Sequence, residues 1–221
     1  MQLINLNGAW KFIVDQDPEY HKGYDYSCES SLRHWDTVMV PGCWNTYREK
    51  YDLFEGVAWF VREFQVGELP GKPAAFLCFD GINYLADIFL NGKKIGAHEG
   101  GYTPFRMDAS SAIHAGMNRL AVRVDNRHLR MKFPPVLGWY NYGGIHRAVS
   151  LIITDRVQIT ELNIAAIPEG KGAAGRIMIK ADPAKESLLV KARVLDYSGR
   201  PVWEGEALAD PNPWPSLGRR A

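Results

Sequence analysis

The sequence predicts an all-β protein, a jelly-roll β-sandwich followed by part of a second sandwich. Three observations lead to this fold class. Short stretches alternate apolar and polar residues, as half-buried strands do. Gly, Pro and Asn divide these stretches at close intervals, and no convincing amphipathic helix longer than about ten residues interrupts them. Frequent short strands separated by turn residues are typical of sandwiches and barrels.

The first domain is predicted to span residues 1–155 and to consist mainly of strands. Asn91-Gly92 gives the strongest hairpin signal, because both residues tolerate a positive φ between the two strands that flank them. Residues 20–33 are polar and irregular, and we expect a loop with a short helix there. The expected strands lie at residues 10–14, 35–40, 57–66, 76–80, 85–90, 94–96, 120–124 and 148–154.

A second domain is predicted over residues 156–221, where the pattern changes. Its strand lengths favour an immunoglobulin-like sandwich, a fold that needs about seven strands in roughly 100 residues. The remaining residues are too few, and the proline-rich stretch 210–215 is not expected to supply the missing strands. We therefore expect a partial immunoglobulin-like domain. Its candidate strands are residues 157–164, 176–181, 188–195 and 201–207.

The charge balance and the cysteines exclude several classes of function. The net charge is +1, and no run of like charges favours a nucleic-acid or membrane partner. No apolar run approaches the roughly 18 residues of a membrane span, and the first residues do not resemble a signal peptide. Three scattered cysteines predict neither a disulfide framework nor a zinc site. We expect a cytoplasmic protein with no metal and no cofactor.

A series of short motifs between residues 6 and 147 resembles the N-terminal part of glycoside hydrolase family 2, in its β-glucuronidase and β-galactosidase branch. Each motif is weak alone, and their order carries the resemblance. The last motif is most similar to the glucuronidase form. The motifs are Leu6–Phe12, Val40–Trp44, Trp59–Arg62, Phe79–Ile82, Phe89–Gly92, His98–Phe105, Gly116–Leu120, Val124–Asn126 and Asn141–Arg147.

The resemblance implies a galactose-binding-like jelly-roll sugar-binding domain, an immunoglobulin-like domain and then a TIM barrel. Family members hydrolyse β-glycosides with retention, using two barrel glutamates whose carboxyls lie about 5–5.5 Å apart. The acid/base glutamate follows an asparagine in the family, and this sequence has no Asn-Glu dipeptide. It is also too short for a further barrel of about 250 residues. We therefore expect no catalytic residue here and no hydrolysis by the chain alone.

Two loops are implied by the resemblance to reach the rim of the parent active site. The first is Leu53–Gly56, where Glu55 could accept hydrogen bonds from sugar hydroxyls or could simply be solvated. The second is Gly138–Tyr142. An aspartate commonly contacts the substrate at the position of Gly138, which offers no carboxylate, so stacking or packing between domains is left for the neighbouring side chains. The candidate rim residues are Glu55, Trp139, Tyr140 and Asn141.

Other conspicuous residues are expected to be structural. Gly100-Gly101-Tyr102 could be a sugar-facing loop, but we expect Tyr102 to pack in a corner that the preceding two glycines shape. His98 and Glu99 could form an acid/base or metal pair, but adjacent strand residues point to opposite faces, so a structural hydrogen-bonding role is expected. Trp10, Trp44 and Trp59 are expected in the core. Ion pairs are expected between Arg62, Arg106, Arg123 or Arg147 and Asp80, Asp108 or Asp125.

The leading hypothesis for function is the non-catalytic carbohydrate-binding and scaffold portion of a retaining β-glycosidase. Its expected partners are a β-glycoside, bound through the parent active site, the TIM barrel of the same polypeptide, and further copies in a homo-oligomer. Two alternatives stay open: a stand-alone lectin-like jelly roll that binds carbohydrate without chemistry, and a structural module for subunit assembly.

Overall fold

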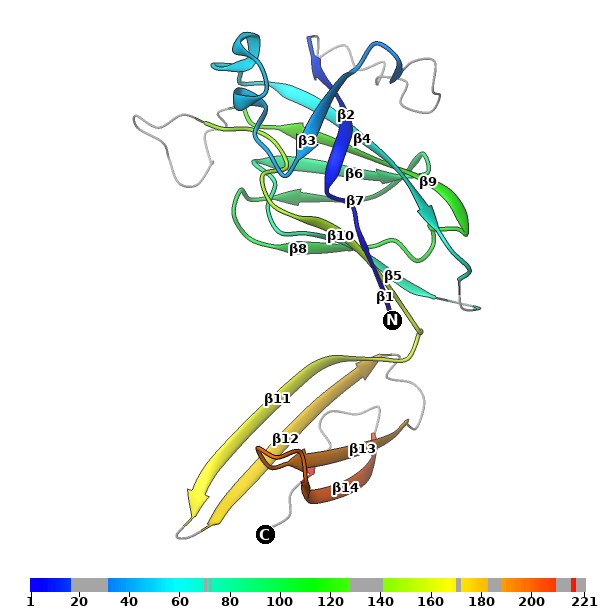
Figure 1. The fold of residues 1–221 in the computed structure, drawn as a ribbon, viewed down its shortest axis with the longest axis vertical. Coiled ribbons are helices and arrows are strands. Elements are labelled where there is room, and N and C mark those ends of the chain that lie inside the picture. The colour runs from blue at the N-terminus through cyan, green and yellow to red at the C-terminus, as the bar shows by residue number, and fades with distance from the viewer. Residues whose placement is uncertain are drawn as a thin grey trace. The chain divides into compact units, whose positions relative to one another are not determined.

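The computed structural model describes residues 1–16, 32–69, 71, 73–127, 141–169, 172–182, 188–209 and 216–217. Over these residues the chain is all β apart from two 3₁₀ helices, η1 (Trp44–Thr46) and η2 (Glu49–Tyr51). The chain divides into two compact units, Met1–Thr154 and Asp155–Ala221, which are coloured in chain order in Figure 1. The predicted all-β class is confirmed.

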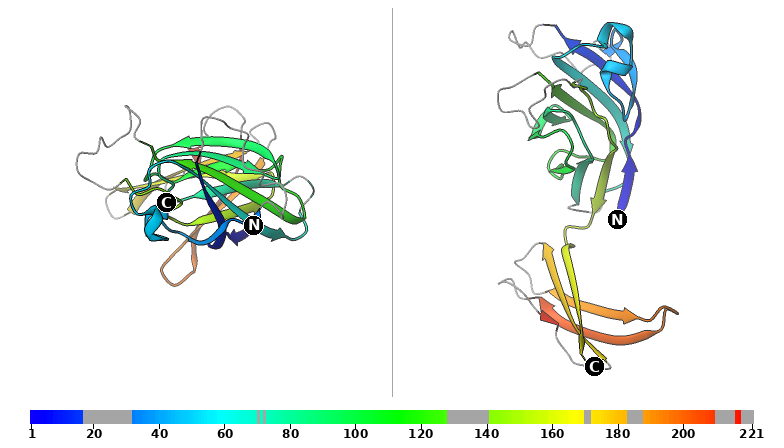
Figure 2. Two further views of the ribbon diagram at one scale, coloured as in Figure 1. Left: turned by 90° about the horizontal axis from the view of Figure 1, so that it is seen from above. Right: turned by 90° about the vertical axis from the view of Figure 1, so that its left-hand side faces the viewer.

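The first unit is a sandwich of two antiparallel sheets, which Figure 2 shows from two further directions. The six-stranded sheet has the order β3 (Asp36–Val40), β2 (Gly8–Asp15), β4 (Val57–Val66), β9 (Gly116–Asp125), β6 (Leu85–Leu90) and β7 (Lys93–Glu99). The four-stranded sheet has the order β1 (Gln2–Asn5), β10 (Val149–Thr154), β5 (Ala74–Phe79) and β8 (Phe105–Asp108). This jelly-roll architecture is the one that the strand pattern predicted.

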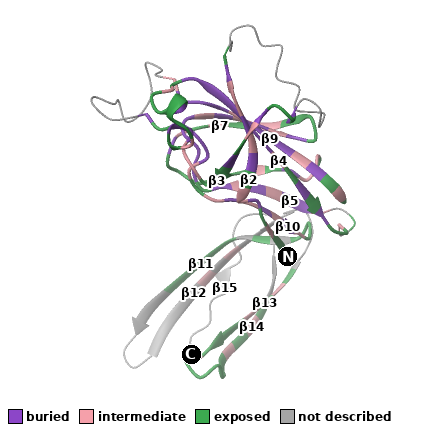
Figure 3. Ribbon diagram, turned by 45° about the horizontal axis from the view of Figure 1, so that its top comes forward, coloured by how far each residue is buried: buried purple, intermediate pink, exposed green. Residues whose placement is uncertain are grey.

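The core lies between the two sheets, because alternate residues of each strand point inward. In β4, Phe60 and Phe64 are buried, and in β10, Leu151 and Ile153 belong to the same apolar cluster. Figure 3 shows buried residues concentrated in this unit. The predicted core positions of Trp10, Trp44 and Trp59 are confirmed, since all three are buried.

The six-stranded sheet also buries part of its outer face. Trp59 and Val61 of β4 form a second cluster there with Leu32 and Trp35, which precede β3, and with Ala121 of β9. The start of β4 is therefore buried on both faces, which explains why it is a continuous apolar run from Val57 to Val61.

The Asn91-Gly92 hairpin is confirmed. Asn91 has a φ of +51° and Gly92 a φ of +81°, and the two residues connect β6 to its antiparallel partner β7. The Asn91 side chain also donates to the Ala112 carbonyl at 2.8 Å and accepts from the Arg119 amide at 2.8 Å. The turn is thus fixed both by its backbone conformation and by its own side chain.

The second unit contains two antiparallel hairpins. β11 (Gln158–Glu169) pairs with β12 (Gly172–Asp182), which also pairs with the short β15 (Ser216–Leu217); β13 (Leu188–Leu195) pairs with β14 (Pro201–Ala209). All four predicted strands are present, and each is as long as predicted or longer. Among the side chains described in this unit, none is buried. Its immunoglobulin-like identity stays a prediction.

Three further findings concern the described residues only. None of the helices there has the length and apolar character to cross a membrane. No group of three or more His, Cys, Asp or Glu side chains within those ranges could hold a metal ion. Of the cysteines, Cys43 and Cys78 are described and are free thiols. The expectations of a cytoplasmic setting and of no cofactor stay predictions.

Candidate functional site

Three segments that are distant in sequence meet at one end of the first unit. The Gly42 amide donates to the Ile145 carbonyl at 2.8 Å, and the Trp44 amide donates to the Gly143 carbonyl at 2.9 Å. The turn before β6 joins them, since the Asn83 amide donates to the Gly144 carbonyl at 3.0 Å. These three segments, residues 41–56, 81–84 and 141–147, together with residues 126–127, which bond to Gly56, form the region that we call the loop end.

The side-chain amide of Asn45 links residues 41–56 to residues 141–147. Its Nδ2 donates to the carbonyls of Tyr51, Asp52 and Phe54 at 3.1, 2.9 and 3.2 Å, which fixes the turn that follows η2. Its Oδ1 accepts from the Gly143 amide at 3.0 Å. Because Asn45 is buried, each of these bonds replaces one that water cannot supply.

Asn126 makes the corresponding link at the start of β4. Its backbone N–H donates to the Gly56 carbonyl at 3.0 Å, and its side-chain Oδ1 accepts from the backbone N–H of Gly56 at 2.8 Å. Its Nδ2 donates to the Asn141 carbonyl at 2.6 Å. Asn126 is fully buried, so the residue after β9 is held both to the first predicted rim loop and to the segment that contains Asn141.

Asn141, predicted at the rim, lies inside this network. Its Nδ2 donates to the Asn126 carbonyl, and its Oδ1 accepts from Asn83 Nδ2 at 3.2 Å. Asn83 Nδ2 also donates to the Tyr142 carbonyl. Asn141 is only 8% exposed. We call Asn45, Asn83, Asn126 and Asn141 the asparagine network. Sequence reasoning singled out neither Asn45 nor Asn83, whose partners are far away in the sequence.

Two adjacent glycines are required where the 141–147 segment crosses the first loop. A Cβ on Gly143 would overlap the Trp44 ring. Gly144 has a φ of +133°, and a Cβ there would lie 2.7 Å from the Gly42 carbonyl oxygen. The close backbone approach that carries the Trp44–Gly143 hydrogen bond therefore depends on glycine at both positions.

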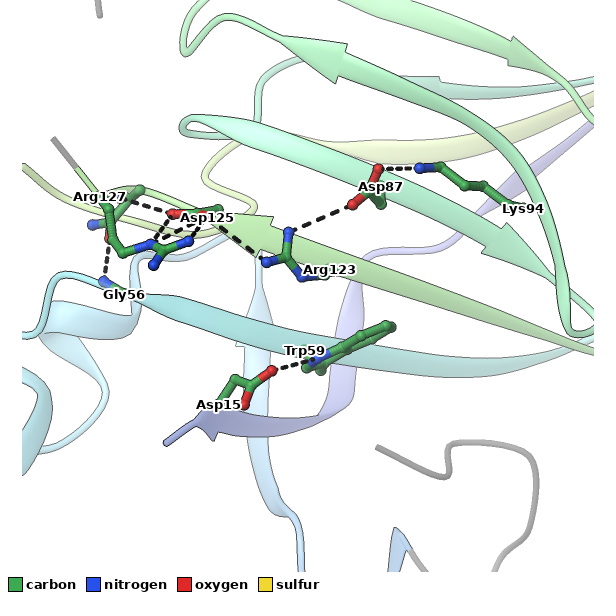
Figure 4. A network of polar contacts seen from close by, with 9 residues as sticks. Asp15, Gly56, Trp59, Asp87, Lys94, Arg123, Asp125 and Arg127 are labelled. Carbon is green, nitrogen blue, oxygen red and sulfur yellow. Dashed lines mark hydrogen bonds and ion pairs between the residues drawn. The ribbon is translucent and has the colours of Figure 1, made fainter. Parts of the chain in front are cut away.

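A chain of charged side chains runs along the outer face of the six-stranded sheet toward the loop end, as Figure 4 shows. Lys94 lies 2.6 Å from Asp87, and Arg123 lies 3.5 Å from Asp87 and 3.8 Å from Asp125. At its end, Arg127 Nη2 lies 2.7 Å from Asp125. The chain thus connects β7, β6 and β9 to the residue that follows Asn126.

Among the charged groups of these ion pairs, the Asp125 carboxylate is the most buried, with 5% of its side chain exposed. Burial by itself would raise its pKa, but the hydrogen bonds and positive charge of Arg127, together with Arg123, hold the pKa below its usual value. Asp125 is therefore ionised at neutral pH and anchors Arg127 by a bidentate contact.

Of the other predicted rim residues, the structure describes Glu55 alone. Glu55 is exposed and is next to Gly56, which Asn126 holds. Trp139 and Tyr140 lie outside the described residues, and so does Gly138. Tyr142 is described and is 46% exposed. The roles proposed for Glu55, Trp139, Tyr140 and Asn141 at a substrate rim stay predictions.

The glycine-aromatic corner differs from its prediction, because the Tyr102 side chain is 60% exposed rather than packed. The residue before it, Gly101, lies against Asn83, where an added Cβ would lie 2.8 Å from Asn83 Oδ1. The centroids of the Tyr102 and His146 rings are 5.7 Å apart in an edge-to-face arrangement. Arg147 Nη1 donates to the Tyr102 backbone carbonyl at 2.9 Å.

Two histidines flank this corner and are held neutral. His98 stacks on Phe105, with 3.8 Å between ring centroids. The Nε2 atoms of His98 and His146 are buried and have no hydrogen-bond partner among the described residues. Burial lowers the pKa of both imidazoles, and the charge of Arg147 lowers the pKa of His146 further.

Most of the expected arginine ion pairs are replaced by other contacts. Only Arg123 reaches an expected partner, Asp125. Arg62 donates to the Ala9 carbonyl, Arg147 to the Tyr102 carbonyl, and the Arg106 guanidinium lies 4.8 Å from the centre of the Phe76 ring. The sequence does not reveal which side chains share a face across paired strands, and these neighbours decide the contacts.

Comparisons with known proteins agree with this architecture. The family model described as the sugar binding domain of glycosyl hydrolases family 2 matches residues 3–155. A beta-glucuronidase of Bacteroides fragilis is 33% identical over 171 residues, which are 75% of this chain and 22% of that protein. A beta-galactosidase of Thermoanaerobacterium thermosulfurigenes is 31% identical over 173 residues, which are 74% of this chain and 23% of that protein.

Solved structures give the same result. The beta-glucuronidase of an uncultured Clostridium sp. has a TM-score of 0.76 with this chain at 28% identity, and the match covers 96% of this chain and 40% of that one. The chain spans about a quarter of the length of the curated relatives it matches. The match covers 24% of a putative beta-glucuronidase of Formosa agariphila and 28% of a beta-galactosidase of Thermoanaerobacter pseudethanolicus. The resemblance thus concerns one part of larger glycoside-processing enzymes.

Proposed function

The chain belongs to glycoside hydrolase family 2 through its sugar-binding domain, and on this premise we propose that it serves as the non-catalytic scaffold of a retaining β-glycosidase. Its task in that enzyme is to hold two loops at the rim of the active site. The relatives that it matches are named as beta-glucuronidases and beta-galactosidases, so a β-linked sugar is the proposed substrate of the parent.

The asparagine network is the observation that supports this proposal. It joins the residues around Gly56 to Asn141 through buried amides, so each loop is positioned by contacts with the other. A buried donor or acceptor that loses its partner costs about 1–3 kcal/mol, which makes any other arrangement of these loops unfavourable. A substrate rim requires this kind of fixed placement, since small displacements of contacting groups reduce rates strongly.

In this proposal the chain contributes binding and positioning, and the two catalytic carboxylates come from a barrel. Glu55, exposed beside the braced Gly56, accepts hydrogen bonds from sugar hydroxyls. Trp139 and Tyr140 offer aromatic faces on which a sugar ring can stack. Asn141 also acts from inside the domain, by holding the loop in place through its bonds to Asn126 and Asn83.

A chimeric enzyme tests this function. Residues 1–155 of this chain would replace the matching domain of the Bacteroides fragilis beta-glucuronidase, and hydrolysis of a chromogenic β-glucuronide would be measured. We expect an active chimera and no hydrolysis by the 221-residue chain alone. In the chimera, Glu55→Gln should raise KM several-fold, whereas Glu49→Gln, an exposed control in η2, should not. Hydrolysis by the isolated chain would overturn the proposal.

One observation favours the lectin-like alternative. The Tyr102 ring is exposed and lies in an edge-to-face arrangement with His146, and an exposed aromatic face can stack on a sugar ring. If the chain is a lectin, neutral sugars should bind to it without any barrel, and Tyr102→Ala should abolish that binding. Calorimetry with galactose and glucose that detects no heat at about 10 mM sugar would exclude this alternative.

A further inference from the structure

β2 and β4 separate at a defined point of the six-stranded sheet. The two strands pair from Asp15–Val57 to Lys11–Val61. Beyond Lys11, β2 stays paired with β3 alone, and β4 continues its pairing with β9 to Val66. A cavity of about 330 Å³ opens where the strands part. It is lined by Ala9, Trp10, Lys11, Leu32, Arg33, Thr37, Val61, Arg62 and Glu63.

Arg62 closes the gap between the two strands. Its Nη1 donates to the Ala9 carbonyl, which is the group that a continued β2–β4 ladder would have satisfied. Its Nε is buried without a hydrogen-bond partner in the part of the chain that the structure describes. Within the described ranges, the guanidinium is thus held at the cavity by its bond to Ala9 and keeps donor capacity that this bond does not use.

The cavity carries an excess of positive charge. Lys11, Arg33 and Arg62 line it, and Glu63 is the one acidic residue among the lining residues that the structure describes. The Glu63 carboxylate is already bound to Arg119, whose Nε donates to it at 2.9 Å. Among the described residues, the hydrogen bond of the Lys11 ammonium is a long one, 3.4 Å to the Thr37 hydroxyl. Cationic side chains in a concave site of this kind attract and orient an anion.

The walls are not uniformly polar, because Leu32 and Val61 line the same space. A ligand that matches the cavity has one anionic group, an apolar face and hydroxyls for Thr37. The volume falls in the usual range for small-molecule sites. A monosaccharide that carries a carboxylate combines all three properties, whereas inorganic phosphate has the charge without the apolar face.

We infer that this cavity is a second ligand site of the domain, specific for a carboxylate-bearing sugar of the uronic acid class. Lys11 and Arg33 bind the carboxylate, and the sugar ring lies in the cavity above its apolar base, where Leu32 and Val61 are 5% and 2% exposed. The site is distinct from the loop end, because Val61 is five residues along β4 from Gly56, roughly 17 Å at the rise of a strand. It goes beyond the proposed scaffold function and does not depend on the rim loops.

Titration of the isolated chain with sodium glucuronate, followed by amide chemical shifts, tests the site. We expect saturable binding in the millimolar range that perturbs the amides of Thr37 and Val61, and at least about tenfold weaker binding of neutral glucose. Lys11→Met and Arg33→Gln should each weaken glucuronate binding about tenfold. Lys191→Met, which removes the same charge in the other unit, should leave it unchanged.

Three results would overturn the inference. The first is no perturbation at about 20 mM glucuronate. The second is binding of inorganic phosphate as tight as that of glucuronate, which would make the cavity a simple anion site. The third is an equal loss in the Lys191→Met control. Thermal melts of both cavity variants check that they fold. Because the readout is binding to the chain alone, its failure leaves the chimera test of the scaffold function unaffected.

Discussion

Asn126 and Asn141 bind each other reciprocally, since the side-chain amide of each donates to the backbone carbonyl of the other. The pair is buried and connects the end of β9 to the segment that leads into β10. Asn126 also holds Gly56, so one residue fixes two loops. We regard this pair as the brace on which the loop end depends.

Removing the brace should destabilise the first unit. Asn126→Ala leaves the Gly56 amide and the Asn141 carbonyl without their partner, and we expect a loss of about 2–4 kcal/mol in the free energy of unfolding. Urea denaturation followed by tryptophan fluorescence measures it. Asn5→Ala, at an exposed position, is the control and should cost less than about 1 kcal/mol. Equal losses in the two variants would show that the network contributes little.

The crossing of the loops should tolerate no side chain at Gly143. Gly143→Ala introduces a Cβ that overlaps the Trp44 ring, and we expect a loss of more than about 2 kcal/mol. Gly67→Ala is the matched control, because no atom lies within 4 Å of its added Cβ. It should change stability by less than about 0.5 kcal/mol. A Gly143→Ala protein that melts like the control would contradict the geometry described for the loop end.

The two neutral histidines predict a loss of stability in weak acid. Because burial lowers the pKa of His98 and His146 in the folded state, the unfolded chain takes up protons first as the pH falls below about 6.5. Stability should therefore decrease from pH 7.5 to pH 5. The urea midpoint measures this dependence, and the double variant His98→Gln, His146→Gln should flatten it. An unchanged slope in the double variant would assign the acid sensitivity to other groups.

The contribution of Asp125 to stability is also lost as the pH falls, but in a lower pH window than that of the histidines. Its pKa is lowered in the folded state, so its contribution is complete above about pH 4 and is lost as the pH falls toward the folded value. At neutral pH, Asp125→Asn should lose about 1–3 kcal/mol, because hydrogen bonds to a charged group are replaced by weaker ones. Asp108→Asn, at an exposed position, should lose much less. Similar losses at pH 7 and pH 2.5 would contradict the role of the Asp125 charge.

The strands and the hairpin could be predicted because their signals are local. Alternation identifies β4 and β9, and Asn91-Gly92 identifies a turn whatever surrounds it. The asparagine network could not be predicted in this way. Asn45 contacts Gly143, 98 positions away in the sequence. The local sequence around an asparagine outside a strand does not show whether its side chain is solvated or buried. Only the three-dimensional arrangement of loops determines which amides meet.

The contacts of the arginines likewise could not be predicted from local sequence signals. Their positions in or beside strands suggested ion pairs, but Arg62 lies in the gap where β2 and β4 diverge, and that gap follows from the register of the two strands. Tyr102 is exposed, and its ring lies next to His146, a contact between segments that are distant in the sequence. In each case the residue type was recognised from the sequence, and its partner was set by packing between elements that no local pattern connects.

The activity of the chimeric beta-glucuronidase with an altered brace tests the central claim most directly. Asn126→Ala and Asn141→Ala would be introduced separately into the chimera that carries residues 1–155 of this chain, and kcat/KM would be compared with that of the unaltered chimera. If the network positions the rim loops, each variant should lose about tenfold or more in kcat/KM under conditions where the protein remains folded. Full activity in folded variants of both kinds would contradict the claim that this domain positions the rim of the active site.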